Sequence, residues 1–283
     1  MGPGDALALV GASAVRAAAG MLRPAVLALT LAPLAIIALA LGALGYAGWD
    51  ATVGGLADWL GSLGPLRGLG EWFGDRGWHW MRHAVAAVAV LAVAVPAVGV
   101  AALLAASLAM TPLLTAGVAR RRFPSLEKRR GGSFWDSLRW SLRSTAAALL
   151  VLAVSLPLWL VPPLMLVIAP LVWGWLTCRV MAFDALAEHA SALERAAILR
   201  RHRWPLLAIG TACGLLGALP ALTWVSALWF VVGFAVLAPL AVWLYAAVLA
   251  FSALWFAEYA LAVLQRMRLA DTPSAHGGAT MRE

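Results

Sequence analysis

The sequence predicts an all-α integral membrane protein. Its 283 residues are 63% hydrophobic and only 12% charged, and the mean hydropathy is +0.88, values far from those of soluble domains. Long stretches without a charged residue alternate with short segments rich in arginine. Uncharged runs of this length are typical of transmembrane helices, and the arginines are typical of their cytoplasmic flanks. We therefore expect two long transmembrane helices, two further helical pairs and interfacial amphipathic helices.

The central segment 144–177 predicts a re-entrant helical hairpin, one of the two helical pairs. It carries no charge, and arginines lie on both sides of it, which places both ends in the cytoplasm. At about 1.5 Å per helical residue, the segment is too short for two full crossings of a hydrocarbon core about 30 Å thick. Pro162 and Pro163 cannot continue a helix, so we expect two shortened helices that meet at these prolines.

Two other uncharged runs predict the membrane-spanning helices. The first, 25–49, is long enough to cross the bilayer with some tilt, and the second, 84–119, returns the chain. The segment between them, 50–82, combines many glycines with four tryptophans and a balanced charge. Glycines favour turns and tryptophans favour the membrane interface. We therefore expect an outward-facing loop here.

The distribution of charge predicts the topology. Eight of the 21 Lys and Arg residues lie between Thr111 and Arg143, whereas the loop at 50–82 holds three. Because cytoplasmic segments collect Lys and Arg, we expect a multi-pass protein of a bacterial-type inner membrane with both termini in the cytoplasm. The basic cluster could also bind RNA or anionic lipid headgroups, but orientation is its commoner role, and we expect no nucleic-acid partner.

Two segments have apolar residues at helical spacing with polar residues between them. These are 1–20 and 178–204, and both are expected to be amphipathic helices at the interface, although 1–20 could instead be a frayed terminus. Within the second segment, Glu188, His189 and Glu194, together with Asp184, resemble a carboxylate and histidine cluster. No further ligand group accompanies them, so we interpret them as a solvent-exposed face and expect no metal site.

The last apolar segment, 205–264, has room for the second helical pair. We expect a break near Gly233 or Pro239. Gly210 and Gly214 form a pattern of small residues four apart, which suits close packing between helices. Residues 269–283 are polar and are expected to be a disordered cytoplasmic tail, which leaves 1–268 as a single membrane domain.

Glu258 is the only charged residue of this last segment. An ionisable group inside a membrane helix is by default a candidate for function, in this case coupling of transport to protons. The alternative is structural. Only about 12 Å of helix separates Glu258 from Arg266, so its carboxylate could simply reach the inner interface.

Three features of the chain resemble the CysZ family of sulfate permeases and the broader etoposide-induced-protein-like membrane family. These are Leu22-Arg23 at the start of the first span, the hairpin broken by prolines, and the pair Phe183-Asp184 that runs into Ala-Glu-His-Ala. The resemblance covers most of the chain. It implies two long transmembrane helices with two inward-dipping hairpins, and uptake of sulfate for cysteine biosynthesis.

The chain departs from the family pattern at two places. The family's Gly-Leu-Arg is Met21-Leu22-Arg23 in this sequence, with Gly20 one position earlier. The Asn-His-Gly that usually follows the aromatic-Asp pair is replaced around 188–190. These departures concern the identity of the substrate more than the fold.

The start of the first span predicts the anion site. The N–H groups of a first helical turn lack partners within the helix, the helix dipole places positive charge there, and a guanidinium fork matches an oxyanion. Pro24 has no N–H and removes one donor. The predicted anion-binding residues are Gly20, Leu22, Arg23, Ala25 and Val26, with Leu27 as a further N–H donor. Alternatively, Arg23 is only a cytoplasmic flanking residue.

We therefore expect a permease for sulfate or a related oxyanion, embedded in the lipid bilayer and without a cofactor. The sequence leaves a homo-oligomer open. The alternative function is a non-transporting membrane scaffold that binds partners through its basic loop and tryptophan-rich surface. An enzyme is not expected, because the sequence has no nucleophile elbow and no glycine-rich phosphate loop.

Overall fold

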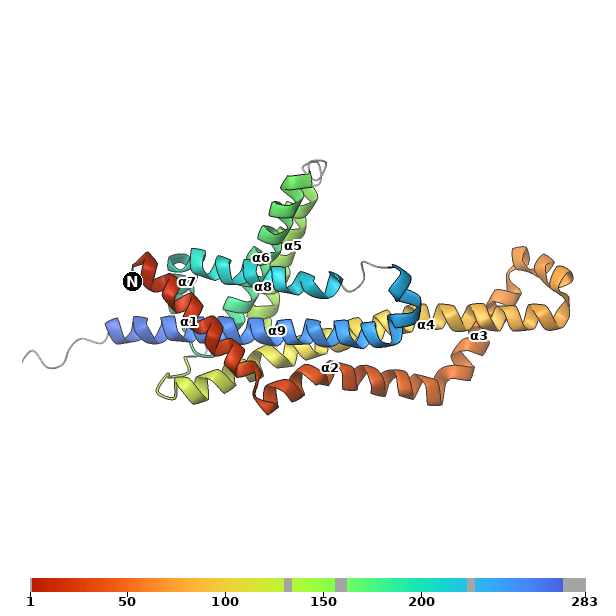
Figure 1. Ribbon diagram of the computed structural model, residues 1–283, viewed down its shortest axis with the longest axis horizontal. Helices are drawn as coiled ribbons and strands as arrows, with labels where there is room; N and C mark the ends of the chain where they lie inside the picture. Colours follow the sequence, from red (N-terminus) through yellow and green to blue (C-terminus); the bar gives the residue numbers. More distant parts are fainter. Residues whose placement is uncertain (1, 130–133, 156–161, 223–226, 272–283) are drawn as a thin grey trace, which may run out of the picture. The chain divides into compact units, whose positions relative to one another are not determined.

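A computed structural model describes residues 2–129, 134–155, 162–222 and 227–271 of the chain (Figure 1). Every regular element within these ranges is helical, which confirms the predicted all-α class. The contacts divide the chain into two compact units, and each is described by itself. Unit 1 comprises Met1–Thr30 with Ser107–Glu283, and unit 2 comprises Leu31–Ala106. The single membrane domain expected for 1–268 stays a prediction, and the polar tail at 272–283 lies outside the described residues.

The helices follow one another with short connections. They are, in chain order, α1 (Pro3–Met21), α2 (Pro24–Ala43), a π-helix (Leu44–Gly48), α3 (Trp49–Ser62), α4 (Gly64–Arg122), α5 (Phe134–Ser155), α6 (Pro162–Ala187), α7 (Ala192–Arg201), α8 (Arg203–Leu222) and α9 (Ala227–Asp271).

Three helical segments among the described residues are long and apolar enough to cross a membrane. They are Pro24–Ser62, Trp80–Arg122 and Pro239–Asp271. The first two contain the two long spans that the uncharged runs predicted. The third shows that the C-terminal segment also has the length and composition of a membrane helix.

The expected loop at 50–82 is helical, so this expectation was wrong. In unit 2, Val53 and Ala57 of α3 pack against Ala86 and Val90 of α4. Each glycine in a helix costs about 1 kcal/mol relative to alanine, but tertiary packing of an apolar face outweighs such propensities. The glycines therefore lower the intrinsic helix propensity of this segment, but within 50–82 only Leu63, between α3 and α4, is not helical.

In unit 1, α5 and α6 pack against each other as the two arms of a hairpin (Figure 1). The predicted break is confirmed because α6 begins at Pro162, a first helical position where proline is tolerated. The arms extend outside 144–177 at both ends. There the Trp140 indole donates a hydrogen bond to the carbonyl of Arg179 at 3.0 Å, and the Arg179 guanidinium lies 4.2 Å from the Trp140 ring centroid. Insertion of the tip part-way into the bilayer stays a prediction.

The expected single helix at 178–204 is divided between the end of α6, α7 and the start of α8, so that expectation was wrong. Ser191 begins α7 as its N-cap. The Ser191 hydroxyl accepts a hydrogen bond from the N–H of Glu194 at 3.2 Å, and the Glu194 carboxylate accepts one from the N–H of Ser191 at 2.7 Å. This capping box starts a new helix. Its sequence signature, Ser followed three residues later by Glu, was overlooked.

The small-residue pattern of α8 makes the close helix contact that it predicted. A Cβ atom placed on Gly174 of α6 would lie 2.6 Å from Cα of Thr211, and one placed on Gly210 would overlap the carbonyl oxygen of Gly174. A Cβ atom on Gly214 would lie 3.5 Å from the backbone nitrogen of Gly174, an ordinary van der Waals distance, so the requirement for glycine applies to Gly174 and Gly210. Only glycine permits backbones to approach this closely.

The C-terminal helix α9 is the centre of unit 1. Residues 252–264 are all buried, and α1, α6 and α8 pack against this helix (Figure 1). The expected break near Gly233 or Pro239 was wrong, because α9 runs from Ala227 to Asp271 with Pro239 inside the helix. Leu9 and Ala17 of α1 are buried in the same core, so the N-terminal segment is a packed helix and not a frayed end.

Candidate anion site

The junction between α1 and α2 fixes the backbone of Arg23. The N–H of Arg23 donates to the carbonyl of Gly20 at 3.2 Å and closes the turn that ends α1. The carbonyl of Arg23 then accepts hydrogen bonds from the N–H groups of Val26 at 2.9 Å and Leu27 at 3.0 Å. Arg23 is therefore the residue from which α2 starts, and its side chain is half-buried.

The predicted first-turn donors have different roles. Because Val26 and Leu27 donate to the Arg23 carbonyl, the N–H of Ala25 is the first-turn donor that is not committed to this bond. Val26 is buried, whereas the Leu22 side chain is 79% exposed. Arg23 and the N–H of Ala25 therefore lie on the same turn of backbone, and Val26 contributes packing there.

Gly20 holds α1 against α9. A Cβ atom on Gly20 would lie 3.3 Å from Cδ1 of Leu254, and the neighbouring Ala17 is fully buried. Small residues at these positions let the two helices approach closely. Gly20 therefore positions the Arg23 turn relative to the core of unit 1.

Polar contacts also fix the same pair of helices, closer to the start of α1. The indole N–H of Trp255 donates to the carbonyl of Val10 at 3.2 Å and to the hydroxyl of Ser13 at 3.1 Å. Trp255 and Glu258 are three residues apart and share a face of α9. On that face the Glu258 carboxylate meets Arg16 of α1.

Glu258 contacts two arginines. Its Oε2 lies 3.2 Å from Nε of Arg16 and 3.5 Å from Nη1 of Arg122, and its side chain is 6% exposed. The sequence singled out Glu258 but gave it no partner. Arg122 was assigned only to the basic cluster that orients the protein. The position of Arg16 between apolar residues of an amphipathic helix was the available signal for a partner.

Glu194 is part of an ion-pair cluster and is not a solvent-exposed residue, which corrects the sequence interpretation. Arg268 binds it in a bidentate manner, with Nε to Oε1 and Nη2 to Oε2 both at 3.0 Å. Arg268 also donates to the carbonyls of Glu127 at 2.9 Å and His189 at 2.7 Å, and Arg129 reaches Glu194 at 3.1 Å. This cluster, the Arg268 clamp, joins the end of α9 to α7 and to the segment after α4.

Burial and charge shift the pKa values of two groups around the clamp. The hydrogen bonds from Arg268 hold the pKa of Glu194 at about 2, against the opposing effect of its burial. His189 is also buried, and burial lowers the pKa of its imidazole. The described residues contain no group of three or more His, Cys, Asp or Glu residues that could hold a metal ion.

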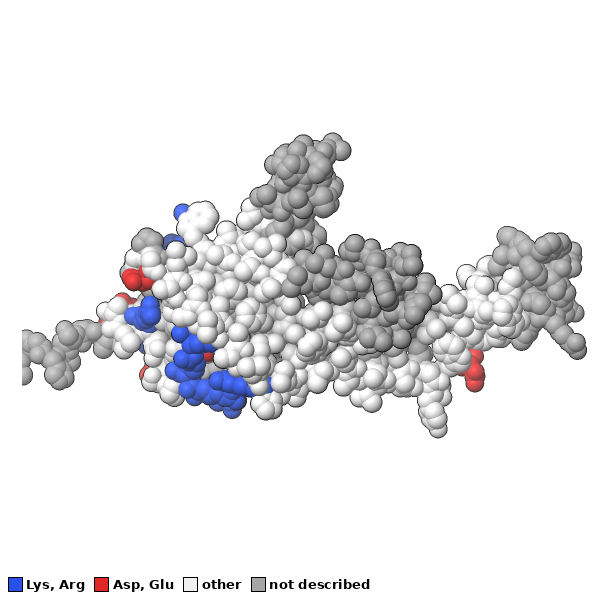
Figure 2. Space-filling model, viewed as in Figure 1, with Lys and Arg blue, Asp and Glu red and all other residues white. Residues whose placement is uncertain are grey.

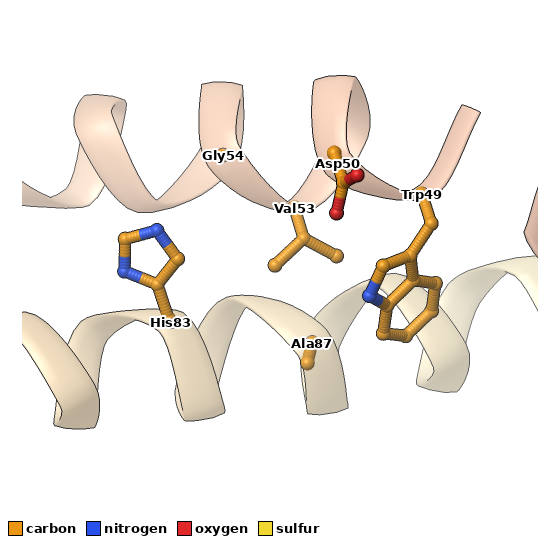
Figure 3. A pocket seen from close by; sticks show the side chains of 6 residues that line it. All are labelled: Trp49, Asp50, Val53, Gly54, His83 and Ala87. Atoms are coloured by element: carbon orange, nitrogen blue, oxygen red, sulfur yellow. The ribbon is translucent and has the colours of Figure 1, made fainter. Parts of the chain in front are cut away.

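Unit 2 has an open pocket between α3 and α4, shown in Figure 3. Its lining consists of Trp49, Asp50, Val53, Gly54, His83 and Ala87. None of the predicted anion-binding residues lies there. Its one acidic and one histidine side chain do not form the group of positive donors that an oxyanion requires.

The comparisons with known proteins agree with the helical membrane architecture. A family model described as sulfate transporter CysZ/etoposide-induced protein 2.4 matches residues 13–227. The matched region includes Arg16, Arg23 and Arg122, whereas Glu258 and Arg268 lie beyond it. No curated protein and no solved structure matches the chain. Since the match covers most of the sequence, the chain belongs to the sulfate transporter CysZ/etoposide-induced protein family.

Proposed function

We propose that this protein is an uptake permease of a bacterial-type inner membrane that carries sulfate or a related oxyanion and supplies sulfate for cysteine biosynthesis. The observation that carries the proposal is the family match over residues 13–227, in a chain with three helices able to span a membrane. The positive groups at the start of α2 and around Glu258 suit an anionic substrate.

Arg23 is the residue proposed to bind the anion at the start of α2. Arg23 is half-buried and directly precedes the first turn of α2, where the N–H of Ala25 lies at the positive end of the helix dipole. Gly20, Leu22 and Val26 form the turn and the packing that hold this pair of donors. A planar guanidinium gives an oxyanion two parallel hydrogen bonds, which an ammonium group does not.

The test of this site is uptake of radiolabelled sulfate by the purified protein in proteoliposomes. Arg23→Lys keeps the charge but loses the bidentate geometry, so uptake should fall about tenfold, and Arg23→Ala should lower it further. Arg200→Ala is the matched control, because Arg200 is an exposed arginine at the end of α7. Uptake by Arg23→Ala at the parent rate would remove Arg23 from the site. No sulfate uptake by the parent protein would favour the non-transporting scaffold.

Topology gives a separate prediction. With both termini and the segment 120–143 in the cytoplasm, a cysteine in place of Asp75 should react with an impermeant thiol reagent added outside intact cells. Cysteines placed at 160–165, the region expected from the sequence to form the tip of the hairpin, should not react. Reaction at the tip from outside would show that the hairpin crosses the whole bilayer. Labelling after cell lysis is the control for reactivity.

A further inference from the structure

We propose that Arg16 and Arg122 form a second oxyanion site, in which the carboxylate of Glu258 is the resident counter-charge. The choice of sulfate as its ligand rests on the proposed function. The existence of a positive site at this place rests on the structure alone. Three helices meet there, because Arg16 belongs to α1, Arg122 to α4 and Glu258 to α9.

The geometry leaves much of the binding capacity of the two arginines unused. A single carboxylate oxygen, Oε2 of Glu258, makes both contacts, through Nε of Arg16 at 3.2 Å and Nη1 of Arg122 at 3.5 Å. A guanidinium has five N–H donors, and each of these contacts uses one. A bidentate pair with one arginine would have satisfied the carboxylate better. Glu258 therefore leaves most N–H donors of the two arginines available to a second anion.

The charges do not balance within this group. Two guanidinium groups and one carboxylate leave one excess positive charge beside the segment 252–264 of α9, all of whose residues are buried. An uncompensated charge next to an apolar interior is unfavourable, and the pairing of a second anion with it reduces that cost. The group therefore attracts an anion in addition to Glu258.

The site is open to solvent on its arginine side. The side chains of Arg16 and Arg122 are 28% and 43% exposed, whereas that of Glu258 is 6% exposed. Figure 2 shows basic side chains gathered on one face over α1 and the C-terminal end of α4. An anion that approaches this face meets the guanidinium groups before it meets the carboxylate. Positive potential at an entrance raises the local concentration of anions.

A polar stripe on α4 continues inward from Arg122. Thr115 and Thr111 precede Arg122 by seven and eleven residues, which places all three on one face of the helix. Both threonines are buried, and the hydroxyl of Thr115 has no hydrogen-bond partner among the described residues. A buried hydroxyl without a partner is a donor available to a ligand or to water. The stripe therefore extends the site toward the core of unit 1.

Equilibrium binding of sulfate distinguishes this site from a purely structural ion pair. We expect Glu258→Gln, measured on the full-length protein in neutral detergent micelles, to lower the Kd for sulfate about tenfold or more, because it removes a negative charge that competes with the dianion. Arg122→Gln should raise the Kd about tenfold. A structural pair predicts no gain in affinity for Glu258→Gln. If that variant does not fold, Arg122→Gln decides, since Arg122 is partly exposed.

Matched controls exclude a general effect of charge. Glu188→Gln removes the same charge from an exposed pair with Lys128, where the two charged atoms lie 3.1 Å apart. Arg121→Gln removes the same charge as Arg122→Gln from the neighbouring exposed position. Both controls should leave the Kd within about twofold of the parent value. Shifts in the controls as large as those in the site variants would overturn the proposal.

Two further experiments are needed. One distinguishes free sulfate from a lipid headgroup as the bound oxyanion, and the other tests the second site independently of the proposed function. Sulfate binding that is lost in nanodiscs of phosphatidylglycerol but kept in phosphatidylcholine would make a lipid headgroup the occupant and overturn the proposed sulfate site. Sulfate uptake by the parent protein without the expected Kd changes would refute the second site alone. Binding with the expected changes but without uptake would refute the permease and leave the site in place.

Discussion

Gly210→Leu should separate α6 from α8 and abolish the folded protein. A Cβ atom at position 210 would lie 2.9 Å from Cβ of Cys178 and would overlap the carbonyl oxygen of Gly174. The second of these atoms belongs to the backbone, so no rotation of a side chain relieves the overlap. Overpacking commonly costs about 1–3 kcal/mol, and a leucine against a backbone should exceed that range. The measurement is the monodisperse fraction recovered by size-exclusion chromatography after heating in detergent.

Gly210→Ala tests the same contact by adding only a Cβ atom at position 210. Alanine gains about 1 kcal/mol over glycine in intrinsic helix propensity, so a net loss of stability would show that the steric overlap dominates. Gly217 is the matched control, because it lies on the same helix and a Cβ atom there would meet nothing within 4 Å. Gly217→Ala and Gly217→Leu should therefore fold normally. Equal stability of the Gly210 and Gly217 variants would contradict the close contact of α6 with α8.

The sequence was sufficient for the features that depend on long uncharged runs. Both predicted spans lie within helices long and apolar enough to cross a membrane, and Pro162 begins the second arm of the hairpin. These predictions succeeded because lipid offers no hydrogen-bond partners to backbone N–H and C=O groups. A long uncharged segment in the membrane therefore forms a helix, in which these groups bond to one another. The small residues Gly210 and Gly214 of α8 also predicted a close helix contact, although they did not identify Gly174 of α6 as the partner.

Two of the errors concern segments where local propensity and tertiary packing disagree. Glycines at 50–82 favoured turns, but burial of Val53 and Ala57 against α4 keeps that region helical. At 178–204 the apolar spacing suggested one surface helix. The capping box at Ser191 and Glu194 instead starts a new helix. Arg268, near the end of α9, binds the Glu194 carboxylate of this helix. No periodicity in one segment reveals a partner on another.

The charged residues of the candidate sites were also predicted only in part. Arg23 was identified from its position before an uncharged run and from the resemblance at Leu22-Arg23. The partners of Glu258 were not identified, because 242 residues separate it from Arg16. A single sequence places a charge in a membrane segment but does not say which opposite charge faces it. That knowledge comes from the helix packing that brings α1 onto α9.

Arg268→Gln should destabilise the protein by about 2–4 kcal/mol, because it removes both bonds of a shielded bidentate pair and leaves backbone carbonyls without donors. The side chains of Arg268 and Glu194 are only 16% and 14% exposed, so solvent screens this pair weakly. Glu194→Gln keeps an oxygen that can still accept from the N–H of Ser191, and its cost should be smaller. Chemical or thermal unfolding in detergent, followed by tryptophan fluorescence, measures both.

The dependence on pH identifies the Glu194 carboxylate as the origin of this stability. Its pKa is depressed from 4.5 to about 2 in the folded protein, so its contribution is fully present above pH 4.5 and is lost as the pH falls toward 2. The stability difference between the parent and Glu194→Gln should therefore be largest near neutral pH and narrow in acid. Lys128→Gln is the control, because its pair with Glu188 is 53% and 49% exposed and contributes less than about 1 kcal/mol. A difference between the parent and Glu194→Gln that stayed constant from pH 7 to pH 3 would assign the effect to lost packing around α7 instead of to charge.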